Sequence, residues 1–133
     1  MRKLLFVLAL CIFPLAGLAQ EKQDKKNLVI KEWNTDPKGV HKILDHVTTY
    51  NADGQKIEEI EYDSAGQKWR KRYERDLNGK VVTEYVYDFR NRLQTYKKFE
   101  YNEFQRRKVQ YTYNPKGKLL SIKHYEYIAQ KAN

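Results

Sequence analysis

Tyr113-Asn114-Pro115-Lys116-Gly117 is the clearest copy of a short phrase that recurs along residues 50–127 of this 133-residue chain. The phrase consists of an aromatic residue, then Asp or Asn, two variable residues and usually Gly. Asp or Asn bonds to the local backbone, Pro presets φ, and Gly accepts positive φ. Each phrase therefore predicts a type I turn that closes a β-hairpin with a small bulge. The predicted turn-forming residues are Asp36 and Gly39, Asn51 and Gly54, Asp63 and Gly66, Asp76 and Gly79, Asp88 and Asn91, Asn102, and Asn114 and Gly117.

The spacing of these phrases indicates the fold class. Their first residues follow one another at intervals of 15, 12, 13, 12, 14 and 12 residues. A turn of four residues leaves about eight residues in each interval, which is the length of a strand. Seven turns that join eight strands predict an all-β fold, namely an antiparallel up-and-down meander built from 12–15-residue repeats. Because no segment offers a second layer, we expect a curled single sheet or an open, barrel-like one.

Period-two alternation predicts one aromatic face and one charged face, provided that the first turn residue pairs with the residue after the Gly. The odd intervals of 15 and 13 would invert this alternation, so we predict a bulge within residues 40–49 and another within 67–74. A bulge near Lys68 would return Trp69 and Tyr73 to the aromatic face. The predicted aromatic face holds Val81, Tyr85, Tyr87, Leu93, Phe99, Tyr101, Val109, Tyr111, Tyr113, Leu119, Tyr125 and Tyr127. The predicted charged face holds Glu59, Glu61, Glu84, Lys98, Glu100, Lys108, Gln110, His124 and Glu126.

The first nineteen residues have the features of a secretory signal. Arg2 and Lys3 precede an apolar run over residues 4–15, and small residues precede a predicted cut after Ala19. The apolar run is too short to span a bilayer, so we expect a secreted or periplasmic protein with no transmembrane span in the mature chain. Cys11, the only cysteine, lies in this segment, so no disulfide is expected. The predicted divisions are a signal peptide at 1–19, a flexible leader at 20–27, a β-repeat domain at 28–128 and a tail at 129–133.

The chain is basic, with a formal net charge of +9. This excess favours anionic partners, or it serves solubility and protects sheet edges. Interleaved Tyr, Lys and Arg side chains also suit single-stranded nucleic acid, but the expected export argues against that partner.

Other sequence features were tested for chemistry. His41 and His46 are five residues apart, which separates them onto opposite strand faces, so no metal site is expected. No glycine-rich phosphate loop is present, and no cofactor is expected. Glu58, Glu59 and Glu61 form either a solvated charge ladder or the acid/base pair of a hydrolase. The hydrolase hypothesis requires raised carboxyl pKa values in a concave pocket.

The recurring Tyr-Asp/Asn-x-x-Gly phrase resembles the YD (RHS-type) repeats of exported bacterial proteins. It is also similar to the MORN-variant repeats of small secreted and immunity-type proteins. The resemblance covers residues 35–127 and implies a β-repeat architecture in a small exported form. Large YD proteins enclose a toxin in a shell. This chain has seven short units and no effector segment, so the resemblance does not imply encapsulation. The family has no catalytic residues that could be assigned to positions of this chain.

We therefore expect a non-enzymatic binding or scaffold protein of the cell envelope, which contacts a glycan or a protein through its aromatic face. The alternative is a small inhibitor or immunity-type protein that blocks a toxin or lytic enzyme. The residues expected to bind are Tyr85, Tyr87, Phe99, Tyr101, Tyr111 and Tyr113.

Overall fold

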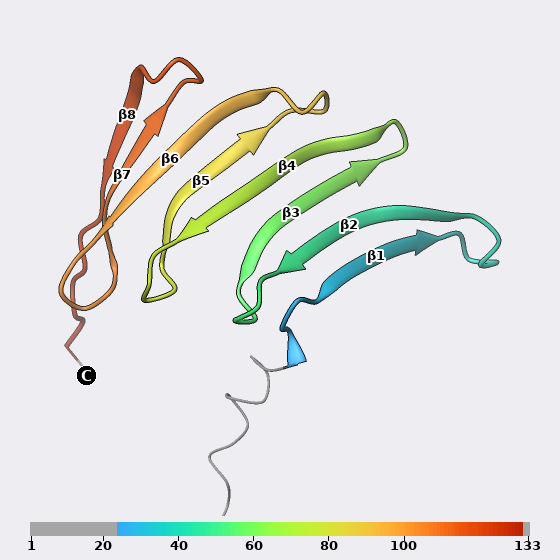
Figure 1. The fold of residues 1–133 in the computed structure, drawn as a ribbon, viewed down its shortest axis with the longest axis horizontal. Coiled ribbons are helices and arrows are strands. Elements are labelled where there is room, and N and C mark those ends of the chain that lie inside the picture. Colours follow the sequence, from blue (N-terminus) through green and yellow to red (C-terminus); the bar gives the residue numbers. More distant parts are fainter. Residues whose placement is uncertain (1–23, 132–133) are drawn as a thin grey trace, which may run out of the picture.

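The computed structural model describes residues 24–131, and within them the chain forms one antiparallel sheet (Figure 1). The predicted signal segment, the cut after Ala19 and residues 20–23 of the leader lie outside the described residues. At the start of the described part, the Asn27 N–H donates to the Asn51 carbonyl at 2.9 Å. The strands are β1 (Val29–Thr35), β2 (Lys42–Tyr50), β3 (Lys56–Asp63), β4 (Gly66–Arg75), β5 (Val81–Tyr87), β6 (Leu93–Tyr101), β7 (Arg107–Tyr113) and β8 (Leu119–His124).

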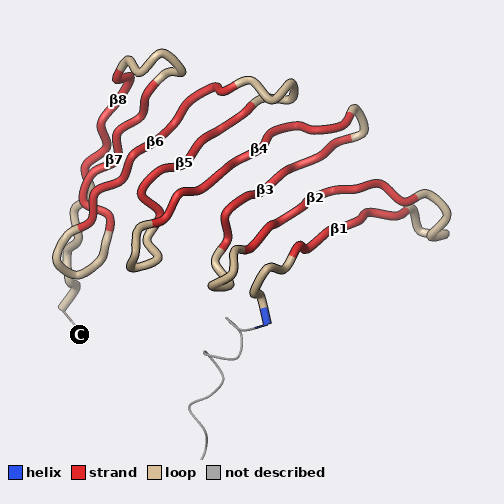
Figure 2. Tube along the Cα trace, viewed as in Figure 1, coloured by secondary structure: helices blue, strands red, loops and turns tan. Residues whose placement is uncertain are grey.

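The sheet is an open, single-layered meander. The strands are ordered β1 to β8 in space as in sequence, and each strand contacts only its sequence neighbours. The sheet twists and curves, but β1 and β8 remain separate edges (Figure 1). Apart from a short helical turn at its start, the described chain consists of strands and loops (Figure 2). The predicted all-β meander of eight strands is confirmed, and the sheet does not close into a barrel.

The turns follow from the Asp or Asn that begins each phrase. In six of the seven turns the side-chain oxygen of this residue accepts two backbone N–H groups, two and four residues further on, at 2.9 to 3.1 Å. Asn91 and Gln105 stand where most phrases have Gly, and both have positive φ, 59° and 62°. Asn tolerates this conformation better than most residues, which explains its use at position 91.

Two turns differ from the predicted form. In the third phrase Asp63 pairs directly with Gly66, so the loop contains only two residues and Asp63 accepts only the Ala65 N–H. In the first phrase the Asp36 N–H donates to the His41 carbonyl, one residue beyond the expected partner. The Asp63 hairpin can be shorter because an extra residue is absorbed within β4.

Both predicted bulges are present. Along β1 and β2 the pairing passes from Glu32–His46 to Trp33–Leu44, which leaves Asp45 without a partner. Along β3 and β4 it passes from Glu61–Trp69 to Tyr62–Gln67, which leaves out Lys68. The odd intervals between phrases thus correspond to an extra residue in each strand.

The other five hairpins each contain a further bulge inside the outgoing strand, beyond the small bulge expected at the turn itself, and this one was not predicted. The residue before the turn pairs with the first residue of the outgoing strand, and the next outgoing residue is then left out of the register. These unpaired residues are Ile57, Val82, Gln94, Lys108 and Leu120. Each bulge inverts the alternation in the rest of its strand. We call the face that bears Tyr85 and Tyr96 the first face, and the face that bears Glu59 and Tyr73 the second face.

The sheet has very little core. Phe99 and Val109, each 6% exposed, are the only buried hydrophobic residues in the described part of the chain. Phe99 pairs with Gln110 on the second face, whereas Val109 pairs with Glu100 on the first. Because burial is this sparse, the structure depends mainly on ladder hydrogen bonds and on cross-strand side-chain pairs, which contribute about 0.2–1 kcal/mol each.

Candidate functional site: the two faces of the sheet

The predicted aromatic face is divided between the two sides of the sheet. The register pairs Tyr85 with Tyr96 and Lys98 with Tyr111, so Tyr85, Tyr87, Tyr111 and Tyr113 share the first face. Phe99 and Tyr101 lie on the second face. The prediction of a single aromatic face is therefore wrong, because the bulge at Gln94 inverts the alternation along β6.

The bulges divide other predicted sets in the same way. Trp69 and Tyr73 lie on the second face, as do Val81, Tyr125 and Tyr127. Glu59, Glu61 and Glu84 also lie there, whereas Lys98, Glu100 and His124 lie on the first face with the tyrosines. The predicted division into a ring face and a charged face is therefore wrong as well. Each face mixes rings with charged groups.

A row of tyrosines crosses the first face, and we call Tyr85, Tyr96 and Tyr113 the tyrosine row. Adjacent strands β5, β6 and β7 place these residues directly opposite one another. The Tyr96 and Tyr113 rings are stacked with centroids 5.0 Å apart and planes inclined by 14°. The Tyr85 and Tyr96 centroids are 6.0 Å apart, at 34°. Offset stacking of this kind stabilises the pair beyond area burial.

Guanidinium groups cover the β4 end of the row. Arg72 lies 5.9 Å from the Tyr85 centroid, and Arg70 lies 4.7 Å from that of Tyr87. The faces of Tyr85 and Tyr96 are thus occupied by neighbouring rings and by Arg72, which leaves mainly ring edges and polar tips for a partner. Burial raises the pKa of Tyr85, as does the neighbouring Glu74. This keeps the Tyr85 hydroxyl protonated as a hydrogen-bond donor.

The sequence analysis missed Tyr96, Arg70 and Arg72 as members of this surface. Tyr96 stands at an even position in a strand whose other expected face residues, Leu93, Phe99 and Tyr101, are odd-numbered. Allowing one extra residue after each turn would have placed Tyr96 opposite Tyr85 and Tyr113. The residues at that extra position are Ile57, Val82, Gln94, Lys108 and Leu120, which share no residue type that would identify the position from sequence.

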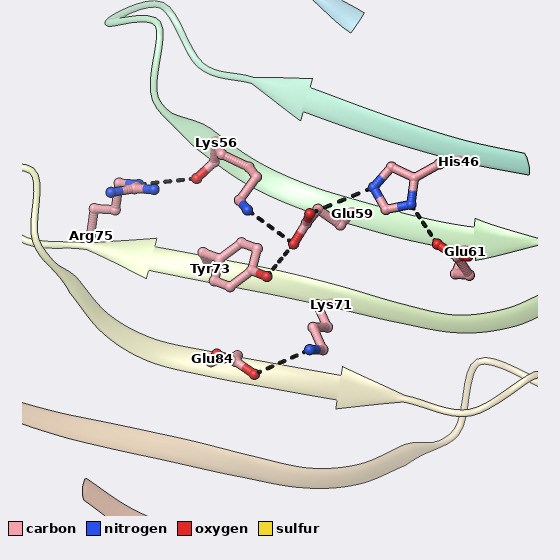
Figure 3. A network of polar contacts seen from close by, with 8 residues as sticks. All are labelled: His46, Lys56, Glu59, Glu61, Lys71, Tyr73, Arg75 and Glu84. Carbon is pink, nitrogen blue, oxygen red and sulfur yellow. Dashed lines mark hydrogen bonds and ion pairs between the residues drawn. The ribbon is translucent and has the colours of Figure 1, made fainter. Parts of the chain in front are cut away.

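The second face carries a polar network over β2, β3 and β4 (Figure 3). His46 Nδ1 lies 2.6 Å from Glu61 Oε2, and His46 Nε2 lies 3.5 Å from Glu59 Oε1. Glu59 also accepts a hydrogen bond from the Tyr73 hydroxyl and pairs with Lys56 Nζ at 3.1 Å. Beside this network, Lys71 of β4 and Glu84 of β5 form a separate ion pair, with 3.9 Å between Nζ and Oε1 (Figure 3).

Each charge in this network is stabilised by an opposite one. Burial alone would lower the pKa of His46, but the hydrogen bond and negative charge of Glu61, with Glu32 and Glu59, raise it above 6.5. Burial alone would raise the pKa of Glu59, but the Tyr73 and Lys56 hydrogen bonds and nearby positive charges lower it. Glu59 is therefore held ionised, which is the opposite of what a general acid requires.

The positions of the three carboxylates argue against the hydrolase hypothesis, because they lie on opposite faces of the sheet. Glu58 pairs with Arg72 on the first face and forms an ion pair with Arg70 at 3.2 Å, whereas Glu59 and Glu61 lie on the second face.

Within residues 24–131 no three His, Cys, Asp or Glu side chains are grouped so as to hold a metal ion. No helix among the same residues is long and apolar enough to cross a membrane.

Comparison with known proteins gives little guidance on function. No protein-family model and no curated protein matches the chain. The accessory secretory protein 1, 2 and 3 structure of Streptococcus pneumoniae is similar over 71% of this chain and 17% of that one, at 18% identity and a TM-score of 0.36. A GtfA/B complex bound to UDP and GlcNAc is similar over 71% of this chain and 20% of that one, at 15% identity and a TM-score of 0.33. The chain thus spans a fifth or less of these proteins, and likeness at this level supports no functional argument.

Proposed function

We propose that this chain is an exported, non-enzymatic β-repeat protein of the cell envelope that binds a partner protein on its first face. The observation that carries the proposal is a half-exposed tyrosine row on a single-layered sheet with almost no core of its own. Tyrosine gives a large contact area with a polar tip at low entropic cost, which makes it frequent at protein interfaces.

The arrangement of the rings favours a protein over a glycan. A sugar ring would need an open aromatic face on which to stack. At Tyr85 and Tyr96 those faces are covered by the next ring, at 5.0 and 6.0 Å, or by Arg72, and Tyr113 is covered on its Tyr96 side. Hydroxyls and ring edges suit the mixed polar and apolar surface of a protein.

The test is affinity capture from envelope extract with a tagged full-length chain. A double variant, Tyr87→Ser with Tyr111→Ser, removes first-face rings that lie outside the stacked tyrosine row, so folding should be retained. The matched control is Val40→Ser, because Val40 is 70% exposed beside the β1–β2 turn, away from the first-face rings. We expect the wild type and the control to capture the same protein and the double variant to lose it. Equal capture by all three, or selective binding of an envelope glycan, would remove the proposal.

An inhibitor or immunity-type role is the second candidate. Leu77 at 107% and Phe104 at 72% are the most exposed hydrophobic residues of two turns at the same end of the sheet. Such tips are suited to entering the cleft of another protein. Inhibition of a toxin or lytic enzyme encoded beside this chain, abolished by Leu77→Ser with Phe104→Ser, would favour this role. Unchanged enzyme activity would exclude it for that enzyme.

A further inference from the structure

Positive charge is concentrated at the β8 edge of the sheet. Residues 24–105 contain sixteen Lys or Arg and fifteen Asp or Glu, a net charge of +1. Residues 106–131 contain seven Lys or Arg and only Glu126 as an acid, a net charge of +6. Almost all of the excess charge of the described chain thus belongs to β7, β8 and their flanking segments.

The seven cations of this edge have no acidic partner in the described residues. None forms an ion pair within 4.0 Å, in contrast to Lys56, Arg70, Lys71 and Arg92 elsewhere in the sheet. Two of them lie against rings: Arg106 is 5.4 Å from the Tyr127 centroid and Arg107 is 4.0 Å from that of Phe99. The cations are Arg106, Arg107, Lys108, Lys116, Lys118, Lys123 and Lys131.

The outer side of β8 also presents unpaired backbone groups. The Tyr125 N–H donates to the Lys108 carbonyl, so the antiparallel alternation directs Ser121 and Lys123 towards β7 as well. Ile122 and His124 therefore direct their N–H and C=O groups outwards, away from the sheet. All six residues of β8 are exposed, including Leu119 at 43% and Ile122 at 47%.

We propose that β8 binds an acidic, extended peptide segment of another protein, which adds to the sheet as a ninth strand. The free N–H and C=O groups would pair with the peptide backbone, as in β-strand addition. Ile122 and Leu119 would contact its apolar side chains, and the surrounding cations its carboxylates. This edge adjoins the first face, since Leu119 pairs with Tyr113 and Ile122 with Tyr111. Its recognition groups are nevertheless the outward N–H and C=O groups of β8 rather than tyrosine rings, so a peptide can bind the edge whether or not a partner protein binds the first face.

Charge and geometry exclude other occupants of this edge. A second copy paired through β8 would bring two edges of +6 together, and like charges disfavour such an interface. The opposite edge, β1, lacks this bias, since residues 24–50 contain five Lys or Arg and four Asp or Glu. A polyanion without a peptide backbone would leave the outward N–H and C=O groups of β8 unpaired.

The probe is an eight-residue capped peptide of alternating Glu and Val, titrated into the full-length chain at low salt. Ile122→Pro removes one outward N–H, which an edge strand tolerates. Lys31→Pro is the matched control on β1, where Tyr50 donates to Leu28 and the alternation points the Lys31 N–H outwards. We expect Ile122→Pro to weaken binding by about tenfold or more, and Lys31→Pro to leave it unchanged. A charge variant, Lys118→Glu with Lys123→Glu, should weaken binding while keeping every backbone group.

Amide hydrogen exchange provides a second readout on the unmodified chain. In the chain without peptide, the Ile122 and His124 amides should exchange faster than those of Ser121 and Lys123. Binding of the peptide should slow exchange at Ile122 and His124. The proposal would be overturned by a peptide N-methylated at alternate residues binding equally well. It would also be overturned if heparin displaced the peptide and the Ile122 and His124 amides were not protected in the peptide complex. Dimers that form through β8 without peptide would overturn it as well.

Discussion

At the scale of the residue, the phrase that recurs in the sequence works through one oxygen atom. Asp or Asn is required because its side-chain oxygen accepts two N–H groups of the same turn, and Gly is favoured because the fourth residue has positive φ. In the Asp76 turn these bonds are both 2.9 Å, and Gly79 has φ of 80°. The turn chemistry is local, which is why it could be read from the sequence.

Gly79 tests this local chemistry. Both Gly79 and Gly39 have positive φ, 80° and 68°, which is unfavourable for a residue with a Cβ. A Cβ at Gly79 would overlap the side-chain amide of Gln55, whereas a Cβ at Gly39 meets nothing within 4 Å. Urea unfolding should show that Gly39→Ala and Gly79→Ala each cost about 1–2 kcal/mol for the left-handed backbone, because the Gln55 amide is the end of a flexible side chain and can move away from the new Cβ. Gly39→Asn should cost less than Gly39→Ala because Asn tolerates positive φ. No loss of stability in either Ala variant would contradict the need for positive φ at the fourth turn residue.

His46 predicts a dependence of stability on pH. Its pKa is raised in the folded chain, so its contribution is fully present below about 6.5 and lost as the pH rises through the raised value. The free energy of unfolding should therefore fall as the pH rises from about 6.5 through the raised pKa in the wild type, and fall less in His46→Gln. The measurement is urea unfolding at several pH values. Parallel curves for the two proteins would mean that the Glu61 contact does not stabilise the imidazolium.

At the scale of the element, the strands could be predicted but the orientation of their side chains could not. Seven turn phrases fix where the chain reverses, and the odd intervals correctly located bulges at Asp45 and Lys68. A bulge directly after a turn changes no interval between phrases, because it recurs in every repeat of regular length. Nothing in the sequence therefore indicated that Phe99 and Tyr101 would face away from Tyr85 and Tyr111, and these two of the six expected binding residues were misplaced.

The tyrosine row makes a prediction for the elements that it joins. Tyr96 of β6 contacts both Tyr85 of β5 and Tyr113 of β7, so its loss removes two ring contacts at once. We expect Tyr96→Ala to lower the free energy of unfolding by about 2 kcal/mol, less than a fully buried aromatic because the ring is half-exposed. The control Phe104→Ala, at an exposed turn, should change it by less than about 0.5 kcal/mol. Similar losses in both variants would show that the row contributes no stacking energy.

At the scale of the whole molecule, the sheet uses hydrogen bonds and side-chain rows in place of a core. Phe99 and Val109 are buried on opposite faces, so neither face of the described sheet has a continuous apolar interior. Side-chain rows replace it: stacked tyrosines with arginines on the first face, and ion-paired carboxylates with Tyr73 and Trp69 on the second. This construction leaves both faces and two edges accessible, which is consistent with a protein that works by binding.

The register of the β5–β6 hairpin tests the central claim most directly, namely that a bulge beside the turn divides the aromatic residues between two faces of an open sheet. Cross-strand NOEs between backbone protons in the NMR spectrum report that register. We predict NOEs that pair Tyr85 with Tyr96 and Thr83 with Lys98. NOEs that pair Tyr85 with Thr95 and Thr83 with Lys97 would show a regular hairpin, return Phe99 and Tyr101 to the face of Tyr85, and contradict this account.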